Sequence, residues 1–304
     1  MSNVKYEEEF ILNSRGVKVF TCRWLPQHCE SKAMIFLCHG YAMDSSASMK
    51  ETGIRLAKAG FAAYGIDYEG HGKSEGLDGL VSCFDDLVGD CSDHFTRICE
   101  IEENRKKMRI LMGVSMGGAV VLLLHRKKPE YWDGAVLVAP LCKLADGMKP
   151  NAVVNGVLTM LGYCIPTWKI IPTNQDIVDL AFRNPRVRKE VRENPYCYKG
   201  KPRLQTGIQL MKISIELEKR LQEVKLPFLV VHGEDDKVTD PSASKLLYHS
   251  ASSSDKTLKL YPGMWHDLLY GELLENMEIV FLDIIKWLDE KFGSVSRLER
   301  EQNK

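Results

Sequence analysis

A serine between glycines, in the segment GVSMG at residues 113–117, carries the strongest chemical signal in the sequence. Residues 108–114 are an apolar run typical of a buried strand, and 116–127 have the character of a helix. A serine at a sharp turn from strand to helix presents its hydroxyl above the sheet, and neighbouring glycines let the two elements approach closely. In this context the G-x-S-x-G pattern predicts that Ser115 is a nucleophile.

A serine hydroxyl needs a base that removes its proton and an acid that orients the base. With this type of turn, the partners follow in the chain order serine, acid, histidine. Beyond the helix behind Ser115, His232 precedes the acidic residues and His249 falls within a predicted helix. His266 lies in the loop after the last predicted strand, at the sheet edge where open α/β sheets bind ligands. His266 is therefore the predicted base.

The acid is expected in the segment VVHGEDDKVTD at residues 230–240. Asp235 and Asp236 both follow the end of a predicted strand, and their spacing alone does not choose between them. Either one can orient His266 and stabilise the imidazolium that forms during proton transfer. Asp240 directly precedes a proline at a predicted helix start, so we expect it to cap that helix.

An oxyanion formed by attack of Ser115 needs hydrogen-bond donors. One donor is the backbone N–H of the next residue, Met116, and the other comes from the loop after a preceding strand. That loop has the sequence CHGY at 38–41, where Gly40 allows the chain to turn and to aim the N–H of Tyr41 at the same point. We therefore expect the backbone amides of Tyr41 and Met116 to form the oxyanion hole.

Short apolar runs alternate with helical segments in the first part of the chain, which predicts the α/β class with a mostly parallel sheet between helices. The runs lie at 33–38, 61–67, 108–114 and 134–140. The next such run begins only at residue 227, far beyond the usual length of a connection. We therefore predict two core parts, 1–140 and 227–304, and a helical insertion at 141–226.

Charge and composition exclude several classes of function. The 41 basic and 41 acidic residues cancel, whereas a nucleic-acid-binding surface needs clustered positive charge. Nine scattered cysteines without a CxxC pattern indicate reduced thiols of a cytoplasmic protein and no metal site. The longest uncharged stretch is too polar for a membrane span. We expect a soluble protein that uses neither a metal nor a cofactor.

The insertion contains a segment, 152–166, that is apolar on nearly every face. As a lid over a serine hydrolase, it would suit acyl chains or a lipid surface. The alternative is that the same side chains form the insertion's own core. The candidate substrate-pocket residues are Leu158, Met160, Leu161, Tyr163, Trp168 and Trp265.

Taken together, these segments resemble the monoacylglycerol lipase and lysophospholipase branch of the α/β-hydrolase superfamily, particularly its plant members, which include the caffeoylshikimate esterases. The likeness covers nearly the whole chain and is carried by CHGY, GIDYEGHGKSEG, GVSMGGA, GAVLVAPLCK, LPFLVVHGEDDKVTDP and DKTLKLYPGMWH. The resemblance places the acid three residues after the glycine of the HG block, at Asp236. It places the nucleophile, the base and the oxyanion donors at Ser115, His266, Tyr41 and Met116.

The chain departs from the resemblance before the nucleophile, where plant relatives usually have Glu or His and this chain has Val114. Because that position is outside the triad, we expect activity to survive with an altered rate or substrate preference. Asp267 adds a carboxylate beside the base, which either favours a charged imidazole or points to water. His39 and Asp44 match a short acyltransferase pattern, HX₄D, but a two-residue pattern arises easily by chance.

The resemblance implies a serine hydrolase of carboxylic esters with a helical cap, and a monoacylglycerol is the first expected substrate. A lysophospholipid, or a hydroxycinnamoyl ester such as caffeoyl shikimate, is the alternative within the same chemistry, and acyl transfer is a further one. A non-hydrolytic small-molecule receptor is the alternative from another class, because a fold does not determine function. The expected partners are a small ester or lipid and, through the insertion, a membrane surface. The oligomeric state is left open.

Overall fold

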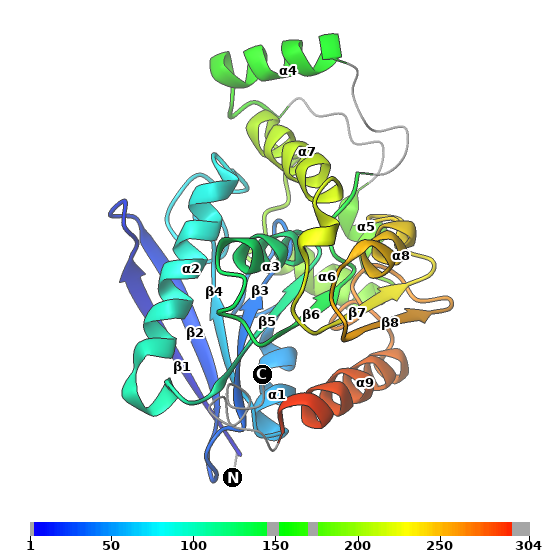
Figure 1. Cartoon of the computed structure of the whole chain (residues 1–304). Coiled ribbons are helices and arrows are strands. Elements are labelled where there is room, and N and C mark those ends of the chain that lie inside the picture. The colour runs from blue at the N-terminus through cyan, green and yellow to red at the C-terminus, as the bar shows by residue number, and fades with distance from the viewer. Residues whose placement is uncertain (1–2, 145–151, 170–175, 294–304) are drawn as a thin grey trace.

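A mixed sheet of eight strands runs through the residues that the computed structural model describes, 3–144, 152–169 and 176–293 (Figure 1). The strands are β1 (Val4–Leu12), β2 (Lys18–Pro26), β3 (Ala33–Cys38), β4 (Ala62–Ile66), β5 (Met108–Val114), β6 (Gly134–Val138), β7 (Phe228–Gly233) and β8 (Lys256–Tyr261). Their order is β1-β2-β4-β3-β5-β6-β7-β8. β2 is antiparallel to β1 and to β4, and all pairs from β4 to β8 are parallel.

Helices connect the parallel strands, because a parallel pair needs a crossover connection. They are α1 (Lys50–Lys58), α2 (Phe84–Glu100), α3 (Met116–Lys127), α4 (Ala152–Cys164), α5 (Ile177–Ala181), α6 (Pro185–Glu193), α7 (Leu204–Glu218), α8 (Pro241–Ser250) and α9 (Leu274–Phe292). Two 3₁₀ turns, η1 (Glu102–Asn104) and η2 (Leu221–Glu223), precede β5 and β7.

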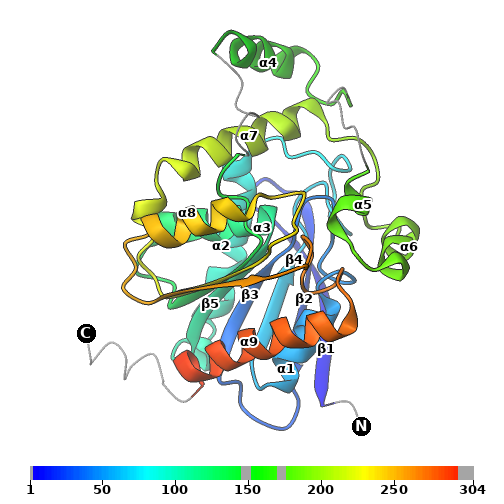
Figure 2. The same ribbon diagram turned by 90° about the vertical axis from the view of Figure 1, so that its right-hand side faces the viewer.

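The two faces of the sheet are covered by different helices (Figure 2). α2, α3 and α8 pack on one face, whereas α1 and α9 pack on the other. Along β3 the side chain of Phe36 enters the first layer and those of Ile35 and Leu37 enter the second. Because the central strands are buried on both faces, their sequences are continuous apolar runs rather than alternating ones.

The segment between β6 and β7, where an insertion is predicted, holds α4 to α7 and no strand among its described residues. α4 packs on α7 and lies farthest from the sheet (Figure 1). α5 and α6 begin where the side chains of Asp176 and Asn184 accept backbone N–H groups of the first helical turn. The N-terminal ends of these two short helices are thus fixed by capping residues next to them in the sequence.

α5 and α6 also share a small apolar cluster that is separate from the two main layers. Its buried members are Val178, Ala181, Phe182, Val187, Val191 and Cys197. Met43, Val238 and Tyr270, from loops that follow β3, β7 and β8, pack against it. The cluster therefore seats α5 and α6 over the carboxyl edge of the sheet.

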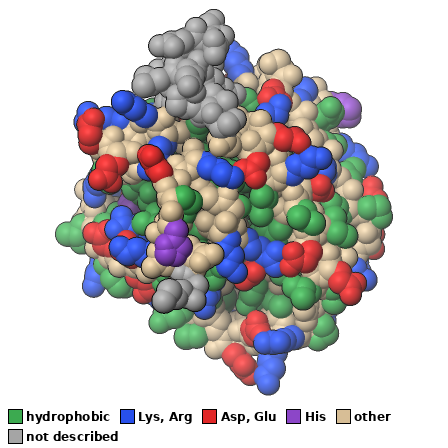
Figure 3. Space-filling model, turned by 90° about the horizontal axis from the view of Figure 1, so that it is seen from below, with side chains coloured by type: hydrophobic (Ala, Val, Ile, Leu, Met, Phe, Trp, Pro, Cys, Tyr) green, Lys and Arg blue, Asp and Glu red, His purple; other side chains and the backbone are tan. Residues whose placement is uncertain are grey.

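That edge gathers the residues to which the sequence assigns chemistry. The loops after β3, β5, β7 and β8 carry Tyr41, Ser115, Asp236 and His266, in that order. Since parallel strands end at a common edge, residues far apart in the chain come together there. Seen from below in the orientation of Figure 1, the surface mixes acidic and basic side chains with apolar ones (Figure 3).

Candidate active site

Ser115 occupies a turn that its neighbours force into an unusual backbone conformation. Its φ and ψ are 55° and −117°, and it stands between the last residue of β5 and the first residue of α3. A Cβ atom on Gly113 would overlap the carbonyl oxygen of Gly117, and a Cβ on Gly117 would overlap that of Cys38. The glycines therefore allow the close approach of strand and helix that holds the serine in this strained position.

His266 and Asp236 lie side by side in the interior. His266 Nδ1 is 2.7 Å from Asp236 Oδ2, and the two residues are 5% and 9% exposed. Asp235, by contrast, lies in solvent. The structure thus brings Asp236, of the two neighbouring aspartates, into contact with the predicted base. With its Nδ1–H donated to a carboxylate, His266 keeps Nε2 as the nitrogen that can accept a proton.

Asp236 is held as a carboxylate. Burial alone would raise the pKa of its carboxyl, but the electrostatic attraction and hydrogen bonds of the neighbouring His266 and His232 outweigh burial and hold the pKa well below its usual range. Its Oδ1 also accepts the backbone N–H groups of Val238 and Thr239 at 2.7 and 3.0 Å. The acid can therefore orient His266 without taking its proton.

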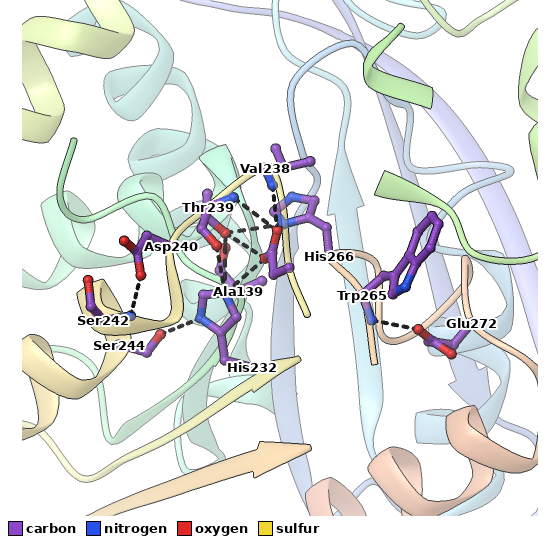
Figure 4. Close-up of polar contacts among 11 residues, drawn as sticks. Ala139, His232, Val238, Thr239, Asp240, Ser242, Ser244, Trp265, His266 and Glu272 are labelled. Atoms are coloured by element: carbon purple, nitrogen blue, oxygen red, sulfur yellow. Dashed lines mark hydrogen bonds and ion pairs between the residues drawn. The ribbon is translucent and has the colours of Figure 1, made fainter. Parts of the chain in front are cut away.

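Two further side chains contact Asp236 that the sequence did not single out for this role (Figure 4). His232 Nε2 lies 2.8 Å from Asp236 Oδ2, and Thr239 Oγ1 lies 2.9 Å from the same oxygen. The sequence places His232 only among the candidate bases, where its position before the acid excludes it. The short spacing of His232 and Asp236 across the turn after β7 was the one sequence feature that could have pointed to this contact. It does so only when the conformation of the turn is known.

The loop predicted to complete the oxyanion hole lies beside Ser115. A Cβ atom added to Gly40 would be 3.6 Å from Ser115 Cβ. The Tyr41 hydroxyl donates to the carbonyl of Gly79 at 3.1 Å, which anchors the loop. Met116 is the first residue of α3, so its N–H has no carbonyl partner within the helix and points from the positive end of the helix dipole.

His39 and Asp44, the residues of the HX₄D pattern, are both fully buried and have separate partners. His39 Nδ1 is 2.8 Å from the carbonyl oxygen of Gly40, and burial lowers the pKa of the imidazole to about 4. Asp44 accepts the backbone N–H of Ala47 at 2.7 Å and the side-chain amide of Asn194 at 2.9 Å. These contacts shape the loop and tie it to the segment after α6.

Ser115 and His266 open into one cavity at the carboxyl edge of the sheet. Most of the lining is apolar and includes Met43, Met49, Val114, Ile177, Phe182 and Leu269. The Ser115 hydroxyl therefore lies at a polar point in an otherwise apolar cavity.

The side chains proposed from the sequence as pocket residues are not among those that line this cavity. In α4, Met160 and Tyr163 are 69% and 85% exposed, and Leu158 and Leu161 are partly buried; Trp168, which follows α4, is 58% exposed. They lie elsewhere because α4 packs on α7, away from the carboxyl edge. The side chains of α5 and α6 occupy the position that the sequence assigned to α4.

Trp265, the sixth of these residues, is next to the base but is partly exposed at the surface. Its ring lies 5.4 Å from the cationic groups of both Arg188 and Lys237. Its backbone N–H donates to the buried carboxylate of Glu272 at 2.6 Å (Figure 4). Trp265 therefore serves to fasten the loop that carries His266.

Asp267 also belongs to that loop, and its carboxylate closes a turn. Oδ1 accepts the backbone N–H of Tyr270 at 3.0 Å. Burial raises the pKa of the Asp267 carboxyl, which the neighbouring His266 and the backbone hydrogen bonds oppose. The sequence offered two alternatives for Asp267, that it favours a charged imidazole or that it points to water. Neither describes its contacts fully, because the carboxylate accepts a backbone N–H of its own loop.

Comparison with known proteins agrees with this geometry. The family model described as "Serine aminopeptidase, S33" matches residues 29–273. The chain belongs to this family. It is 35% identical over 293 residues to the caffeoylshikimate esterase of Arabidopsis thaliana, which covers 94% of this chain and 88% of that protein. It is 30% identical over 301 residues to the monoglyceride lipase of Mus musculus, which covers 96% and 94%.

Solved structures of other proteins share the fold. The monoacylglycerol lipase of Paleococcus ferrophilus aligns with a TM-score of 0.74 at 25% identity, over 90% of this chain and 99% of that one. The α/β-hydrolase fold and the family resemblance predicted from the sequence are thereby confirmed.

Proposed function

We propose that the protein is a serine hydrolase that cleaves monoacylglycerol into fatty acid and glycerol. One observation carries this proposal: the strained Ser115 and the His266–Asp236 pair meet at a single apolar cavity. The names of its relatives, caffeoylshikimate esterase and monoglyceride lipase, are those of ester-cleaving enzymes. A binding protein would have no need of the strained turn or of the buried acid and base.

In the reaction, the Ser115 hydroxyl attacks the ester carbonyl and His266 Nε2 takes its proton. Asp236 stabilises the resulting imidazolium through the 2.7 Å contact with Nδ1. The backbone N–H groups of Tyr41 and Met116 bind the oxyanion. The imidazolium then protonates the leaving alcohol, and a water molecule activated by His266 cleaves the acyl-enzyme.

The apolar lining of the cavity favours an aliphatic acyl group. Each methylene that leaves water there contributes about 0.8 kcal/mol to binding. Phe182 from α5's carboxyl end and Leu269 from the loop after β8 offer such contacts beside Ser115. These contacts are made by the acyl chain whatever alcohol leaves, so the cavity supports a lipid ester as substrate.

A caffeoyl ester is the second candidate, because the chain is 35% identical to a caffeoylshikimate esterase. Tyr41 and Tyr198 also line the cavity, and aromatic side chains stack well on an aromatic acyl group. A lysophospholipid remains the third substrate of the same chemistry. The three differ in the leaving alcohol as well as in the acyl group.

We also propose that residues 141–226 form a cap that contacts membranes from the cytoplasmic side. Val157, Met160 and Tyr163 in α4, and Trp168 in the segment after it, have exposed side chains. α4 itself lies at one end of the molecule (Figure 1). In the described residues, no helix is long and apolar enough to cross a bilayer. The nine cysteines, which all lie in the described residues, are thiols rather than disulfides, as is usual in a reducing compartment. Peripheral contact would bring the protein close to lipid substrates.

The test compares purified wild type with Ser115→Ala. A fluorophosphonate probe should label the wild type at Ser115 and leave the variant unlabelled. Values of kcat/KM are then measured with monooleoylglycerol, lysophosphatidylcholine and caffeoyl shikimate. The largest value for the glyceride supports the proposal, whereas the largest value for caffeoyl shikimate replaces it with the second candidate. Rates that do not depend on Ser115, without labelling, overturn the hydrolase function.

A further inference from the structure

The acid of the site is shared between two histidines (Figure 4). Asp236 Oδ2 lies 2.7 Å from His266 Nδ1 and 2.8 Å from His232 Nε2. His266 enters the reaction, but the mechanism above gives His232 no part. His232 is the penultimate residue of β7, and its side chain is 0% exposed.

The neighbours of His232 define which of its nitrogens carries the proton. Nε2 faces two acceptors, Asp236 Oδ2 and the carbonyl oxygen of Thr239 at 3.1 Å, so Nε2 must be a donor. Nδ1 lies 2.7 Å from the hydroxyl of Ser244, which can donate to it. A neutral ring with its proton on Nε2 satisfies every one of these contacts.

The arrangement is closed to solvent. Ser244, in α8, is 0% exposed like His232 itself. No water can therefore replace the donor that His232 gives to Asp236 without rearrangement, and an unmet acceptor in the interior is costly. A chain of hydrogen bonds thus runs from α8 through the end of β7 to the acid and on to the base.

We propose that His232, oriented by Ser244, is a positioning residue that holds Asp236 Oδ2 against His266 and shares the charge of that oxygen. The proposal rests on the proposed function, since it gives His232 a role in the same triad. No proton passes to or from His232, which remains the Nε2–H tautomer throughout the cycle. Its contribution is to the orientation of the carboxylate and to the strength with which it holds the imidazolium.

Loss of the His232 donor has two consequences. The carboxylate gains freedom to turn, so the fraction of molecules with an aligned base falls and kcat decreases. Its Oδ2 also keeps more negative charge and holds the protonated His266 more strongly. The acid limb of the pH profile of kcat/KM should therefore move to higher pH. The other charged groups that act on these histidines, Asp267 beside His266 and Asp240 near His232, stay unchanged.

Two substitutions of the ring separate these effects from simple packing. His232→Leu removes the donor, and we expect kcat to fall about 10- to 100-fold, as for loss of one hydrogen bond to a charged group. KM should stay within about twofold, because the ring does not line the cavity. His232→Gln places an amide N–H near the position of Nε2 and should restore most of kcat and the pH profile. A structural role alone would affect both variants through stability and would not shift the profile.

Ser244→Ala provides the second measurement if His232→Leu does not fold. It removes only the hydroxyl that faces Nδ1 and should lower kcat severalfold. Ser242→Ala, on the same helix but without a contact to His232, is the matched control and should leave kcat unchanged. Folding of each variant is checked by circular dichroism and thermal melting.

The tautomer can be read without any activity. In protein with ¹⁵N-labelled histidine, NMR should show a protonated Nε2 and an unprotonated Nδ1 for His232, assigned by loss of the signals in His232→Gln. A proton on Nδ1 overturns the proposal, as does a folded His232→Leu with wild-type kcat and pH profile. Failure of the fluorophosphonate to label wild-type Ser115 would instead overturn the proposed function, and the NMR result would stand apart from it.

Discussion

The imidazole of His266 and the carboxylate of Asp236 meet at 2.7 Å although thirty positions separate them in the chain. β7 ends just before the turn that carries Asp236, and β8 ends before the loop that carries His266. The two strands are parallel neighbours, with Gly233 opposite Tyr261. The pairing of β7 with β8 therefore brings the two residues into contact. Substitutions of Asp236 or His266 should change the activity of the site directly.

Replacing Asp236 should remove most of the activity, whereas replacing its neighbour Asp235 should leave the activity unchanged. We expect Asp236→Asn to lower kcat about 10³- to 10⁴-fold, because an amide cannot hold His266 in the tautomer that accepts the proton. Asp235→Asn, one residue away in solvent, should retain wild-type kcat. Steady-state kinetics on monooleoylglycerol measure both. Equal losses in the two variants would contradict the assignment of the acid.

A second prediction concerns the pH dependence of stability. Burial raises the pKa of the Asp67 carboxyl to about 7, against the effect of hydrogen bonds from the backbone N–H groups of Lys73 and Ser45. Its ordinary value is about 3.9. The folded state therefore holds a proton that the unfolded state has lost. The contribution of Asp67 to the free energy of unfolding is greatest below about pH 4 and decreases as the pH rises to about 7.

The measurement is the melting temperature of wild type and Asp67→Asn between pH 4 and 8. Because the amide of the variant does not titrate, the difference between the two proteins should move in favour of the variant across the window and become constant above pH 7. Parallel curves throughout this range would show that the carboxyl is already ionised in the folded protein at pH 4.

A third prediction concerns the residue before the nucleophile. Val114 lines the cavity and is 7% exposed. Val114→Glu would place a carboxylate against the acyl chain, and burying that charge is unfavourable. We expect kcat/KM to fall at least about tenfold more for monooleoylglycerol than for a short-chain ester such as p-nitrophenyl acetate.

Val114→Ile is the matched control, because it keeps the lining apolar at nearly the same size. It should change the two kcat/KM values by similar factors. If Val114→Glu lowers kcat/KM for both substrates by the same factor, the side chain acts on Ser115 itself and not on the acyl group.

A fourth prediction tests the contact of α4 with membranes. Replacing Met160 and Tyr163 by Asp should weaken binding to phosphatidylcholine vesicles about tenfold or more, because exposed apolar side chains supply the attraction. Hydrolysis of p-nitrophenyl acetate in solution should be unchanged, since neither residue lines the cavity. Co-sedimentation with vesicles measures the binding.

Leu282→Asp serves as the control on another face. Leu282 lies in α9 and is 67% exposed, comparable with Met160. Its replacement should leave vesicle binding intact. If both changes weaken binding alike, attachment is a general effect of surface hydrophobicity rather than a property of α4.

The amino-acid sequence was sufficient for the features that local physics controls. Continuous apolar runs predicted the buried parallel strands, because a strand covered on both faces has no polar side. The glycines around Ser115 predicted its turn, because only residues without side chains fit there. The blocks around these elements also predicted the family, which the comparison confirmed.

Tertiary structure decided what depends on which way a loop or helix faces. Asp235 and Asp236 are the same residue type at adjacent positions, and only the turn after β7 buries one of them beside His266. His232 reaches the same carboxylate because that turn folds back over the strand end. α4 and α5 are both apolar enough to cover a cavity, but α4 packs on α7 while α5 lies over Ser115. The hydrophobic effect favours burial of an apolar helix but does not select the surface on which the helix packs. The packing of the whole chain therefore determines which helix lines the cavity.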